Sequence, residues 1–560
     1  MAQFSLNVAK SIGNEIGEWF QVNITDFNTS LASTCHSTHL FDIYIWGDVA
    51  YRNQDRQITA DLLNGLKKCY TGRSWVLINK ETRIVYAASD EFGTFPLLVY
   101  QHQQHTIIAS SRTALINCLE DNVEFNQTAL RNLLALGQLF NSDCIIKHTQ
   151  HFTGESLIKV NLNNHTLEKQ KIQAQYVKCL NKNTKYSHAK DAFIEAVRKC
   201  FKHDNNPLVS LSGGLDSRAI LSACDVLNLK PEGLCYGEVN STDVQYAIKL
   251  ANACNLKLFH SKNSTTHFDR QTITRITQAS MGEVPFHHAH ALIDNQLLDQ
   301  TQGRTIITGT GAETYRAFYY DRGMPGFRFF GQNSLNKYTV PRIERYISEE
   351  LTKQTWPIAQ LLLKDIVSID ETINDFMKAH ICSYVDAAKQ ADQFYLKARC
   401  QRMVVAGQQL LDSYYNRTHP FLNDEVVCTM FNLPAKYKLH SAFHRKLISD
   451  LSPKLAALPW DKTNKPLNRG LTLGQKYPGL VSRFGLNGHF GKRSKPMYQY
   501  DYSEVSQSVL LATVNILGLG DKDKAALISQ IRQYKLENYI IGFGLVWLNC
   551  VDKAQILKAS

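Results

Sequence analysis

The stretch from Leu208 to Arg218, which reads LVSLSGGLDSR, decides how the rest of the sequence is interpreted. Residues 208–211 have the pattern of a short buried strand, and a helix is predicted at 218–227. Twin glycines between a strand and a helix let the backbone approach an anion, and the helix N-terminus offers N–H groups to it. Asp216 would repel phosphate oxygens unless a cation lay between them, and magnesium favours one or two carboxylates with phosphate oxygens. The stretch therefore predicts a phosphate-binding loop that contains a metal ion.

Strands and helices alternate around this loop. Further strands are predicted at 233–236, 256–259 and 304–308, and further helices at 190–201 and 243–254. This alternation is typical of a parallel sheet covered by helices. Beyond about residue 345 the pattern is mainly helical.

The first 185 residues are predicted to be rich in β-strands instead. Short apolar or alternating runs, separated by polar or glycine-bearing turns, lie at 41–46, 75–78, 83–87, 96–100 and 106–109. One helix is predicted at 126–136, with Asn126 as its N-cap. The polar stretch 180–187, LNKNTKYS, shows no periodicity and is the predicted linker between the two parts.

The composition indicates a globular chain. Hydrophobic residues make up 44% and charged residues 20% of the 560, which excludes a disordered or collagen-like chain. The formal charge of +12 permits an anionic partner without requiring one. The 13 cysteines include no CxxC pair and no zinc spacing, so we expect reduced thiols. No signal-peptide core is visible, and the apolar stretch 539–548 is about half a membrane span, so we expect a cytoplasmic protein without a membrane partner.

Five motifs carry a resemblance to a known family. SGGLDS fits neither a Walker A loop nor GxGxxG, but it resembles the pyrophosphate loop of N-type ATP pyrophosphatases. The wider chain resembles the asparagine synthetase superfamily, which includes β-lactam synthetases and lasso-peptide cyclases. YGE at 236–238 is similar to the family segment that borders adenine, and TGTGAET at 308–314 to the family's SGEGSDE. RTHPFLN at 417–423 is similar to ARVPFLD, and PWDKTNK at 459–465 lies where the family has a lysine-bearing loop.

The resemblance implies an α/β fold in three parts. Residues 1–185 would form a glutaminase-like, Ntn-type αββα domain without its nucleophile. Residues 186–475 would form a parallel-sheet ATP pyrophosphatase domain of the asparagine synthetase type. Residues 476–560 would form a basic loop and a helical C-terminal extension.

The resemblance also implies a reaction. A substrate carboxylate would attack the α-phosphate of ATP, giving an acyl-adenylate and pyrophosphate, and an amine would then displace AMP to leave an amide. The implied cofactors are ATP and Mg²⁺, with Asp216 and Glu313 as metal ligands. Lys462, ahead of Lys465, is the expected cation at the α-phosphate. The residues expected to contact the nucleotide are Leu211, Ser212, Gly213, Gly214, Asp216, Ser217, Tyr236, Gly237 and Gly309.

Two departures from the family pattern modify this expectation. Glu313 stands for the family's metal-binding Asp, and Thr310 for a Glu that helps to deprotonate the attacking amine, so no general base is assigned. Ala2 stands where glutamine-using members have a cysteine with a free α-amine, and the first cysteine is Cys35. We therefore expect no glutamine hydrolysis, and the amine would come from a substrate or from free ammonia.

Two other functions stay open. A loop of this kind also adenylates RNA bases, and the basic stretch from Lys462 to Lys495 would suit RNA, although we expect it to be a cationic lid. A non-catalytic ATP-binding partner protein is the second alternative, because of Thr310 and Ala2. The expected partners are a small-molecule or peptide carboxylate and an amine donor; proteins of the same pathway are left open, and nucleic acid is not expected.

Two further groups of side chains are given structural interpretations. We interpret His287, His288 and His290 as a polar loop at the rim of the cleft rather than a metal site, because partner ligands with zinc spacing are missing. The aromatic residues around Arg316 are expected to pack in the core rather than contact a substrate. They are Tyr315, Tyr319 and Tyr320.

Overall fold

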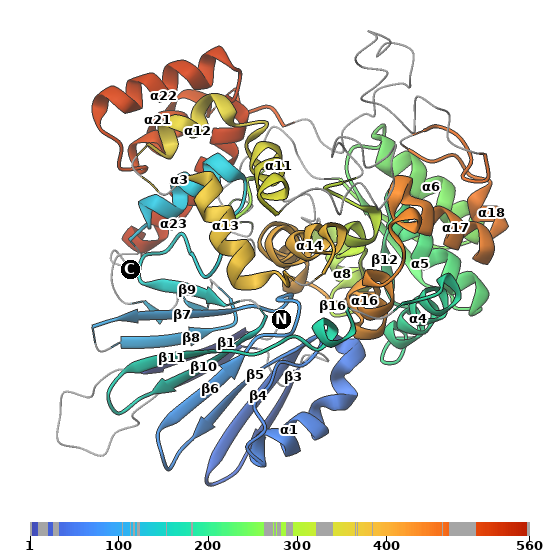
Figure 1. The fold of residues 1–560 in the computed structure, drawn as a ribbon, viewed down its shortest axis with the longest axis horizontal. Coiled ribbons are helices and arrows are strands. Elements are labelled where there is room, and N and C mark those ends of the chain that lie inside the picture. The colour runs from blue at the N-terminus through green and yellow to red at the C-terminus, as the bar shows by residue number, and fades with distance from the viewer. Residues whose placement is uncertain are drawn as a thin grey trace.

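The computed structural model describes most of the chain as a mixed α/β protein (Figure 1). The residues outside the description are 1–2, 9–20, 26–32, 104, 112–113, 116–117, 120–123, 153, 181–182, 263–272, 274–275, 277–281, 287–294, 321–339, 365, 367, 384, 462, 470–499, 504 and 557–560. Of strands β1 (Gln3–Val8) and β2 (Gln21–Thr25), the backbone alone is described.

A five-stranded parallel sheet lies in the C-terminal half, and its strand order fixes the position of the candidate loop. The order is β14-β13-β12-β15-β16, and every neighbouring pair is parallel. The strands are β12 (Leu208–Ser210), β13 (Glu232–Tyr236), β14 (Leu258–Ser261), β15 (Thr305–Ile307) and β16 (Asn416–Thr418). The chain runs outward from β12 to β14 and returns on the other side of β12 with β15. The carboxyl end of β12 is therefore the switch point, where open parallel sheets hold their ligands.

Helices bury both faces of this sheet. Val209 packs with Phe193 and Val197 of α4 (Tyr186–Cys200) and with residues of α5 (Leu215–Val226). Alternate residues point to the other face, where Leu208 packs with Ile306 and Leu411. The predicted parallel sheet with covering helices is thus confirmed, although α4 and α5 begin earlier than predicted. The short strand β16 was not predicted, because it lies in a stretch with a helical pattern.

The N-terminal half consists of two stacked antiparallel sheets with a helix on each outer face. Their strand orders are β2-β1-β8-β7-β9 and β11-β10-β6-β5-β4-β3. The remaining strands are β3 (Ser33–Ser37), β4 (Phe41–Gly47), β5 (Arg73–Asn79), β6 (Ile84–Ala88), β7 (Leu97–His102), β8 (His105–Ala109), β9 (Thr149–Phe152), β10 (Ser156–Asn161) and β11 (Thr166–Lys171). In β5, Val76 and Ile78 pack between the sheets, and Trp75 and Leu77 pack against α1 (Asp55–Leu63). Helix α3 (Gln127–Leu136) covers the other sheet, with Asn126 as its N-cap as predicted, so the layer order is αββα.

The C-terminal segment returns to the N-terminal half. Helices α21 (Ser506–Asn515), α22 (Asp521–Gln533) and α23 (Glu537–Ile556) lie beside α3 and α12 (Trp356–Leu362), as Figure 1 shows in red, cyan and yellow. The Tyr539 hydroxyl donates to the Leu134 carbonyl at 3.1 Å. The helical extension that the sequence predicts is therefore part of the main core rather than an appendage.

The other helices fill the space between these parts. They are α6 (Thr242–Cys254), α8 (Asn295–Thr301), α11 (Val340–Thr352), α13 (Ile369–His380), α14 (Ala387–Phe394), a π-helix (Tyr395–Val404), α15 (Val405–Gln408), α16 (Asp424–Phe431), α17 (Ala442–Leu451) and α18 (Pro453–Ala456). Short 3-10 helices lie at Val49–Gln54, Gln175–Cys179, Ala312–Arg316, Gln409–Ser413, Pro420–Leu422, Ala435–Tyr437 and Leu439–Ser441. Within the described residues, every helix is too short or too polar to cross a membrane, and the described cysteines form no disulfide.

A buried arginine joins the two halves. Arg402, on the π-helix, donates to both oxygens of Glu283, at 2.9 and 3.3 Å, and to the carbonyls of Asn141 and Asp143. Arg402 and Glu283 are each about 1% exposed. Burial disfavours the charged carboxylate, but the positive charge of Arg402 outweighs it and lowers the pKa of Glu283 to about 2. The charge of Glu283 is therefore linked to folding.

Replacing Glu283 by Gln is expected to lower the free energy of unfolding by about 3 kcal/mol at neutral pH, because Arg402 would be buried without a counter-charge. The folded-state pKa of about 2 lies below the usual 4.5, so this stabilisation is complete above pH 4.5 and is lost as the pH falls toward 2. Urea unfolding midpoints of both chains over that pH range measure the effect, and the gap between them should narrow in acid.

The control is Glu349→Gln. Glu349 pairs with Arg345 on the surface, where it is 63% exposed, so its loss should change stability by less than about 1 kcal/mol. A Glu283→Gln variant that behaves like this control would contradict the prediction.

Candidate functional site

The loop SGGLDS connects the end of β12 to the start of α5. Gly214 is the N-cap residue of α5 and supplies no side-chain cap, so the helix N-terminus presents its backbone N–H groups at the carboxyl edge of the sheet. The buried Leu211 anchors the loop by donating its N–H to the Leu234 carbonyl at 2.8 Å. The Ser217 hydroxyl lies 3.4 Å from both the N–H and the carbonyl of Ser212. Ser217 thereby links the end of β12 to the first turn of α5.

One loop donor is already used by an acidic side chain. The N–H of Gly213 donates to Oδ1 of Asp243, the second residue of α6, at 3.0 Å. An anion bound at this N–H has to displace the Asp243 carboxylate. The sequence places Asp243 at the start of a helix, after the segment that resembles the adenine border of the family, but nothing in the spacing reveals a contact between α6 and the loop.

Asp216 and Glu313, the two expected metal ligands, both contact an arginine. Nη2 of Arg316 lies 3.1 Å from Oδ2 of Asp216 and 3.0 Å from Oε1 of Glu313. On its other side, Asp216 has Nε2 of the fully buried His444 at 3.3 Å from Oδ1. Burial works against it, but the two carboxylates raise the pKa of Arg316 above its usual value, so this guanidinium is charged. The described residues therefore put a fixed cation at the place where the sequence predicts magnesium.

A magnesium ion at the predicted position would compete with Arg316 for the same two carboxylates. A magnesium ion bridging the two carboxylates would have to approach each to about 2.1 Å and would meet the guanidinium there. The guanidinium of Arg316 occupies the space between Oδ2 of Asp216 and Oε1 of Glu313, so the residues as arranged do not fit magnesium between these two carboxylates.

The segment TGTGAET follows β15 and packs directly on the loop. A Cβ atom on Gly309 would lie 2.7 Å from Cβ of Asp216, so only glycine allows this approach. Gly311 has a φ of +88°, and a Cβ there would lie 2.4 Å from Leu422. The two glycines bring Glu313 and Arg316 over the phosphate loop.

Thr310 belongs to a buried chain of hydrogen bonds. Nε2 of His419 faces Nη1 of Arg417 at 3.5 Å, so Nδ1 carries the proton and donates to the Thr308 hydroxyl at 2.8 Å. The Thr308 and Thr310 hydroxyls are 2.8 Å apart, and Thr310 donates to Oε1 of Gln408 at 2.5 Å. Burial and Arg417 hold the pKa of His419 well below its usual range. Thr310 therefore cannot take up a proton from an amine, and the general base is not replaced at this position.

The N-terminal half holds the segment RTHPFLN in place. Oδ2 of Asp48 accepts the N–H of His419 at 3.0 Å, and the Tyr51 hydroxyl accepts from Asn423 at 2.8 Å. Arg417 donates to the Thr94 carbonyl at 3.2 Å. Burial raises the pKa of Asp48 to about 6 despite these hydrogen bonds. The two halves of the chain thus meet beside the candidate site.

A hairpin at 459–466 lies over the other side of the loop. Pro459 and Pro466 form an antiparallel bridge, and a Cβ on Gly213 would lie 3.0 Å from Cβ of Asp461. The fully buried Arg218 donates to the carbonyls of Leu458 and Pro459 at 3.0 and 2.8 Å. Arg218 was missed as a site residue because only the fold reveals what it contacts.

Two expected lysines have different outcomes. Lys462 lies outside the described residues, although its neighbours Asp461 and Thr463 are in the hairpin. Lys465 is described and exposed on the same hairpin, where its carbonyl accepts the N–H of Trp460 at 3.0 Å. Of the residues next to Lys462 in the sequence, Asp461 lies against Gly213 of the loop.

The remaining expected residues lie at the same edge of the sheet. Tyr236 ends β13, and its hydroxyl is 3.2 Å from Oγ of Ser210 in β12. Gly237 follows with a φ of +129°, and its carbonyl faces Nε2 of His260 at 2.8 Å. The structure therefore brings together the residues expected at the nucleotide, apart from Lys462: Leu211, Ser212, Gly213, Gly214, Asp216, Ser217, Tyr236, Gly237, Gly309 and Glu313.

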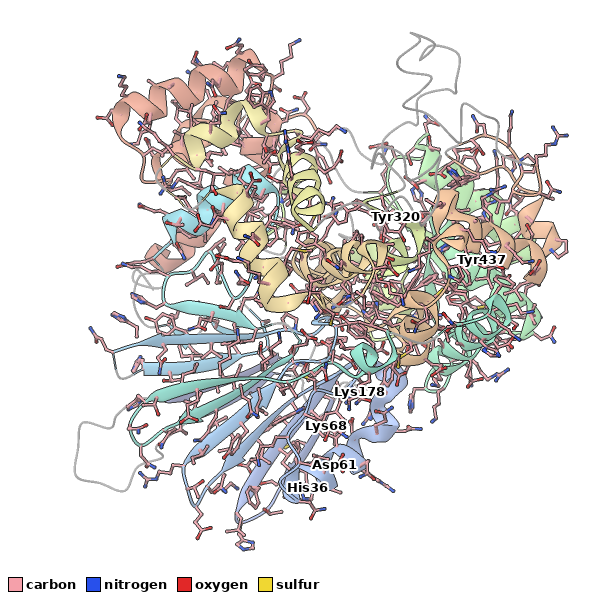
Figure 2. All side chains as sticks on the ribbon, in the orientation of Figure 1. His36, Asp61, Lys68, Lys178, Tyr320 and Tyr437 are labelled. Carbon is pink, nitrogen blue, oxygen red and sulfur yellow. The ribbon has the colours of Figure 1, made fainter. Side chains whose placement is uncertain are left out.

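Aromatic residues near Arg316 form part of the core. Tyr315 donates to the Phe421 carbonyl at 2.7 Å, and Tyr320, among the helices of the C-terminal half in Figure 2, donates to Asp392 at 3.1 Å. Tyr319 is also buried, so the packing interpretation holds for all three. His287, His288 and His290 lie outside the described residues.

Comparisons with known proteins give no family for this chain. No family model matches it, and no curated protein matches it. Among solved structures, 26 chains match. One is the allosteric regulatory enzyme of purine biosynthesis, at 10% identity and a TM-score of 0.16, with 51% of this chain and 58% of that chain covered. The match thus spans less than two thirds of that enzyme's length.

A second match is glutamine phosphoribosylpyrophosphate amidotransferase from B. subtilis, complexed with ADP and GMP. It is 9% identical, with 56% of this chain and 71% of that chain covered and a TM-score of 0.17. Likenesses this weak carry no argument about the function of this chain.

Replacing Gly309 by Ala is expected to lower the free energy of unfolding by about 1–3 kcal/mol, because the new methyl group overlaps Asp216. Thermal unfolding measures the loss. The matched control is Gly407→Ala in α15, where a Cβ meets nothing within 4 Å and the helix should be stabilised by up to about 1 kcal/mol. Equal melting temperatures for the two variants would contradict the close approach of Gly309 to Asp216.

Proposed function

We propose that the protein is an ATP-dependent amide-forming ligase. It would activate a substrate carboxylate as an acyl-adenylate, release pyrophosphate, and pass the acyl group to an amine without hydrolysing glutamine. The observation that supports the proposal is the position of SGGLDS at the switch point of the parallel sheet, next to TGTGAET on β15 and YGE on β13.

The loop and the segments beside it would bind different parts of the nucleotide. The N–H groups of Gly213 and Gly214 and the hydroxyls of Ser212 and Ser217 would donate to the pyrophosphate as it leaves, since preorganised donors favour developing negative charge. Leu211, Tyr236, Gly237 and Gly309 lie at the same edge of the sheet and would border the adenosine.

Charged groups would act at the α-phosphate and at the leaving group. Lys462 is proposed to neutralise charge that develops on the α-phosphate. The family resemblance implies a magnesium ion at the leaving pyrophosphate. Asp216 and Glu313 are the side chains that the sequence assigns to it, but they already hold Arg316.

The amine is proposed to come from a second substrate or from free ammonia. Cys35, the first cysteine of the sequence, lies on β3, where burial and the nearby Asp42 raise its pKa. A cysteine with a raised pKa is a poor nucleophile. Cys35 therefore does not supply the thiolate that a glutaminase needs.

Replacing Asp216 by Asn is expected to reduce ATP–pyrophosphate exchange by about a hundredfold or more. The carboxylate that positions the Arg316 guanidinium at the leaving group would be lost. Exchange of labelled pyrophosphate into ATP, with a panel of carboxylates, measures it. The matched control is Asp225→Asn on the same helix, whose carboxylate pairs with Lys454 and Ser452 away from the loop and whose loss should leave exchange unchanged.

Other outcomes would favour the alternatives. AMP release that RNA triggers and carboxylates do not would identify an RNA-adenylating enzyme. ATP binding without exchange across the whole panel would identify a non-catalytic partner protein. Full exchange activity in Asp216→Asn would contradict the role of this carboxylate.

A further inference from the structure

We infer that Arg316, and not a divalent cation, is the resident counter-charge of Asp216 and Glu313, and that its outer edge binds the pyrophosphate end of the nucleotide. The inference rests on the proposed nucleotide site and adds how that site would meet a polyphosphate.

The guanidinium of Arg316 lies between the two carboxylates. One nitrogen, Nη2, contacts both carboxylates, at 3.0 and 3.1 Å, and so lies between them. An ion that bridged the same two oxygens would need that space. Gly309 approaches Cβ of Asp216 closely, and Nε2 of His444 lies 3.3 Å from its Oδ1, so this side chain has little room to turn toward an ion elsewhere.

The positive charge of Arg316 also reduces the attraction of this site for a divalent cation. Two carboxylates and one guanidinium leave a net charge of −1, whereas the carboxylates alone would carry −2 and attract a divalent cation. Adding a divalent ion beside a fixed guanidinium brings two like charges together. The side chain of Arg316 is 15% exposed, so water screens this repulsion only in part.

Nε and Nη1 of the Arg316 guanidinium take no part in the two carboxylate contacts. Within the described residues, all ion pairs and hydrogen bonds of Arg316 are made by Nη2. Nε and Nη1 therefore have no protein partner there. A guanidinium offers five donors in a rigid fork that matches phosphate oxygens, so one side can hold the carboxylates while the other binds a phosphate. Asp216 lies in the first turn of α5, so Arg316 contacts the N-terminal end of this helix.

The test measures metal binding and pyrophosphate binding separately on the full chain. Manganese is the metal probe, followed by its electron paramagnetic resonance signal, and inorganic pyrophosphate is the anion probe, followed by calorimetry with EDTA or with Mn²⁺. The wild-type protein is expected to show no Mn²⁺ site that depends on Asp216. Its pyrophosphate affinity should change by less than about threefold between EDTA and Mn²⁺, because the cation is part of the protein.

Replacing Arg316 by Ala is expected to weaken pyrophosphate binding and to create a metal site. Pyrophosphate affinity in EDTA should fall by about tenfold or more, as when a charge-assisted hydrogen bond is lost. A new Mn²⁺ site should appear, restore part of that affinity, and disappear again when Asp216→Asn is added. Arg316→Lys should keep the metal out but bind pyrophosphate weakly, because an ammonium lacks the second donor edge. The control Arg345→Ala, which removes an exposed arginine paired with Glu349, should change neither measurement.

The measurements separate a failure of this inference from a failure of the proposed ligase function. A wild-type Mn²⁺ site that Asp216→Asn abolishes, or pyrophosphate binding that requires metal, would overturn this inference and leave the proposed ligase function standing. An absence of binding of both pyrophosphate and ATP to the wild-type protein, with or without metal, would overturn both. The wild-type measurements decide the question even where Arg316→Ala fails to fold.

Discussion

The central position of β12 in the parallel sheet is the constraint on which the candidate site depends. Strands on both sides pair with β12, so the segments that follow β13 and β15 must emerge beside the loop that follows β12. Close packing then fixes the details. A Cβ on Gly233 would lie 2.7 Å from the Leu211 side chain, and one on Gly309 would overlap Asp216, so the loop is held from both neighbouring strands by glycines. The sheet thereby sets the positions of the backbone N–H groups of this loop.

Much of this arrangement is visible in the sequence, for physical reasons. Buried parallel strands are apolar throughout, so LVSL and GLCY stand out, and alternating patterns in the first 110 residues identify the antiparallel sheets. The edge where the loops meet follows from the parallel order alone. The strand β16 could not be found this way, because its sequence, NRT, contains no apolar run and the strand is formed by its pairing with β15.

The side chains that define the electrostatics of the site could not be predicted. Arg316 was read as one of a group with its aromatic neighbours, although Tyr315 turns into the core and Arg316 turns toward Asp216. Arg218 and Arg417 belong to the segments LVSLSGGLDSR and RTHPFLN, but the sequence indicates no partner for either. Each is fully buried and bound to backbone carbonyls of a distant segment. Burial of a charged group is favourable only where acceptors converge on it, and that convergence is a property of the fold rather than of the local sequence.

The segment RTHPFLN has a consequence for the chain as a whole. Its residues hydrogen-bond to Asp48, Tyr51 and Thr94 of the N-terminal half while Thr418 and His419 reach β15 and Thr308. Without the first half, three polar groups inside the second would lose their acceptors and donors at once. At the edge of the sheet where the candidate site lies, the hydrogen bonding of the second half is therefore completed by the first half.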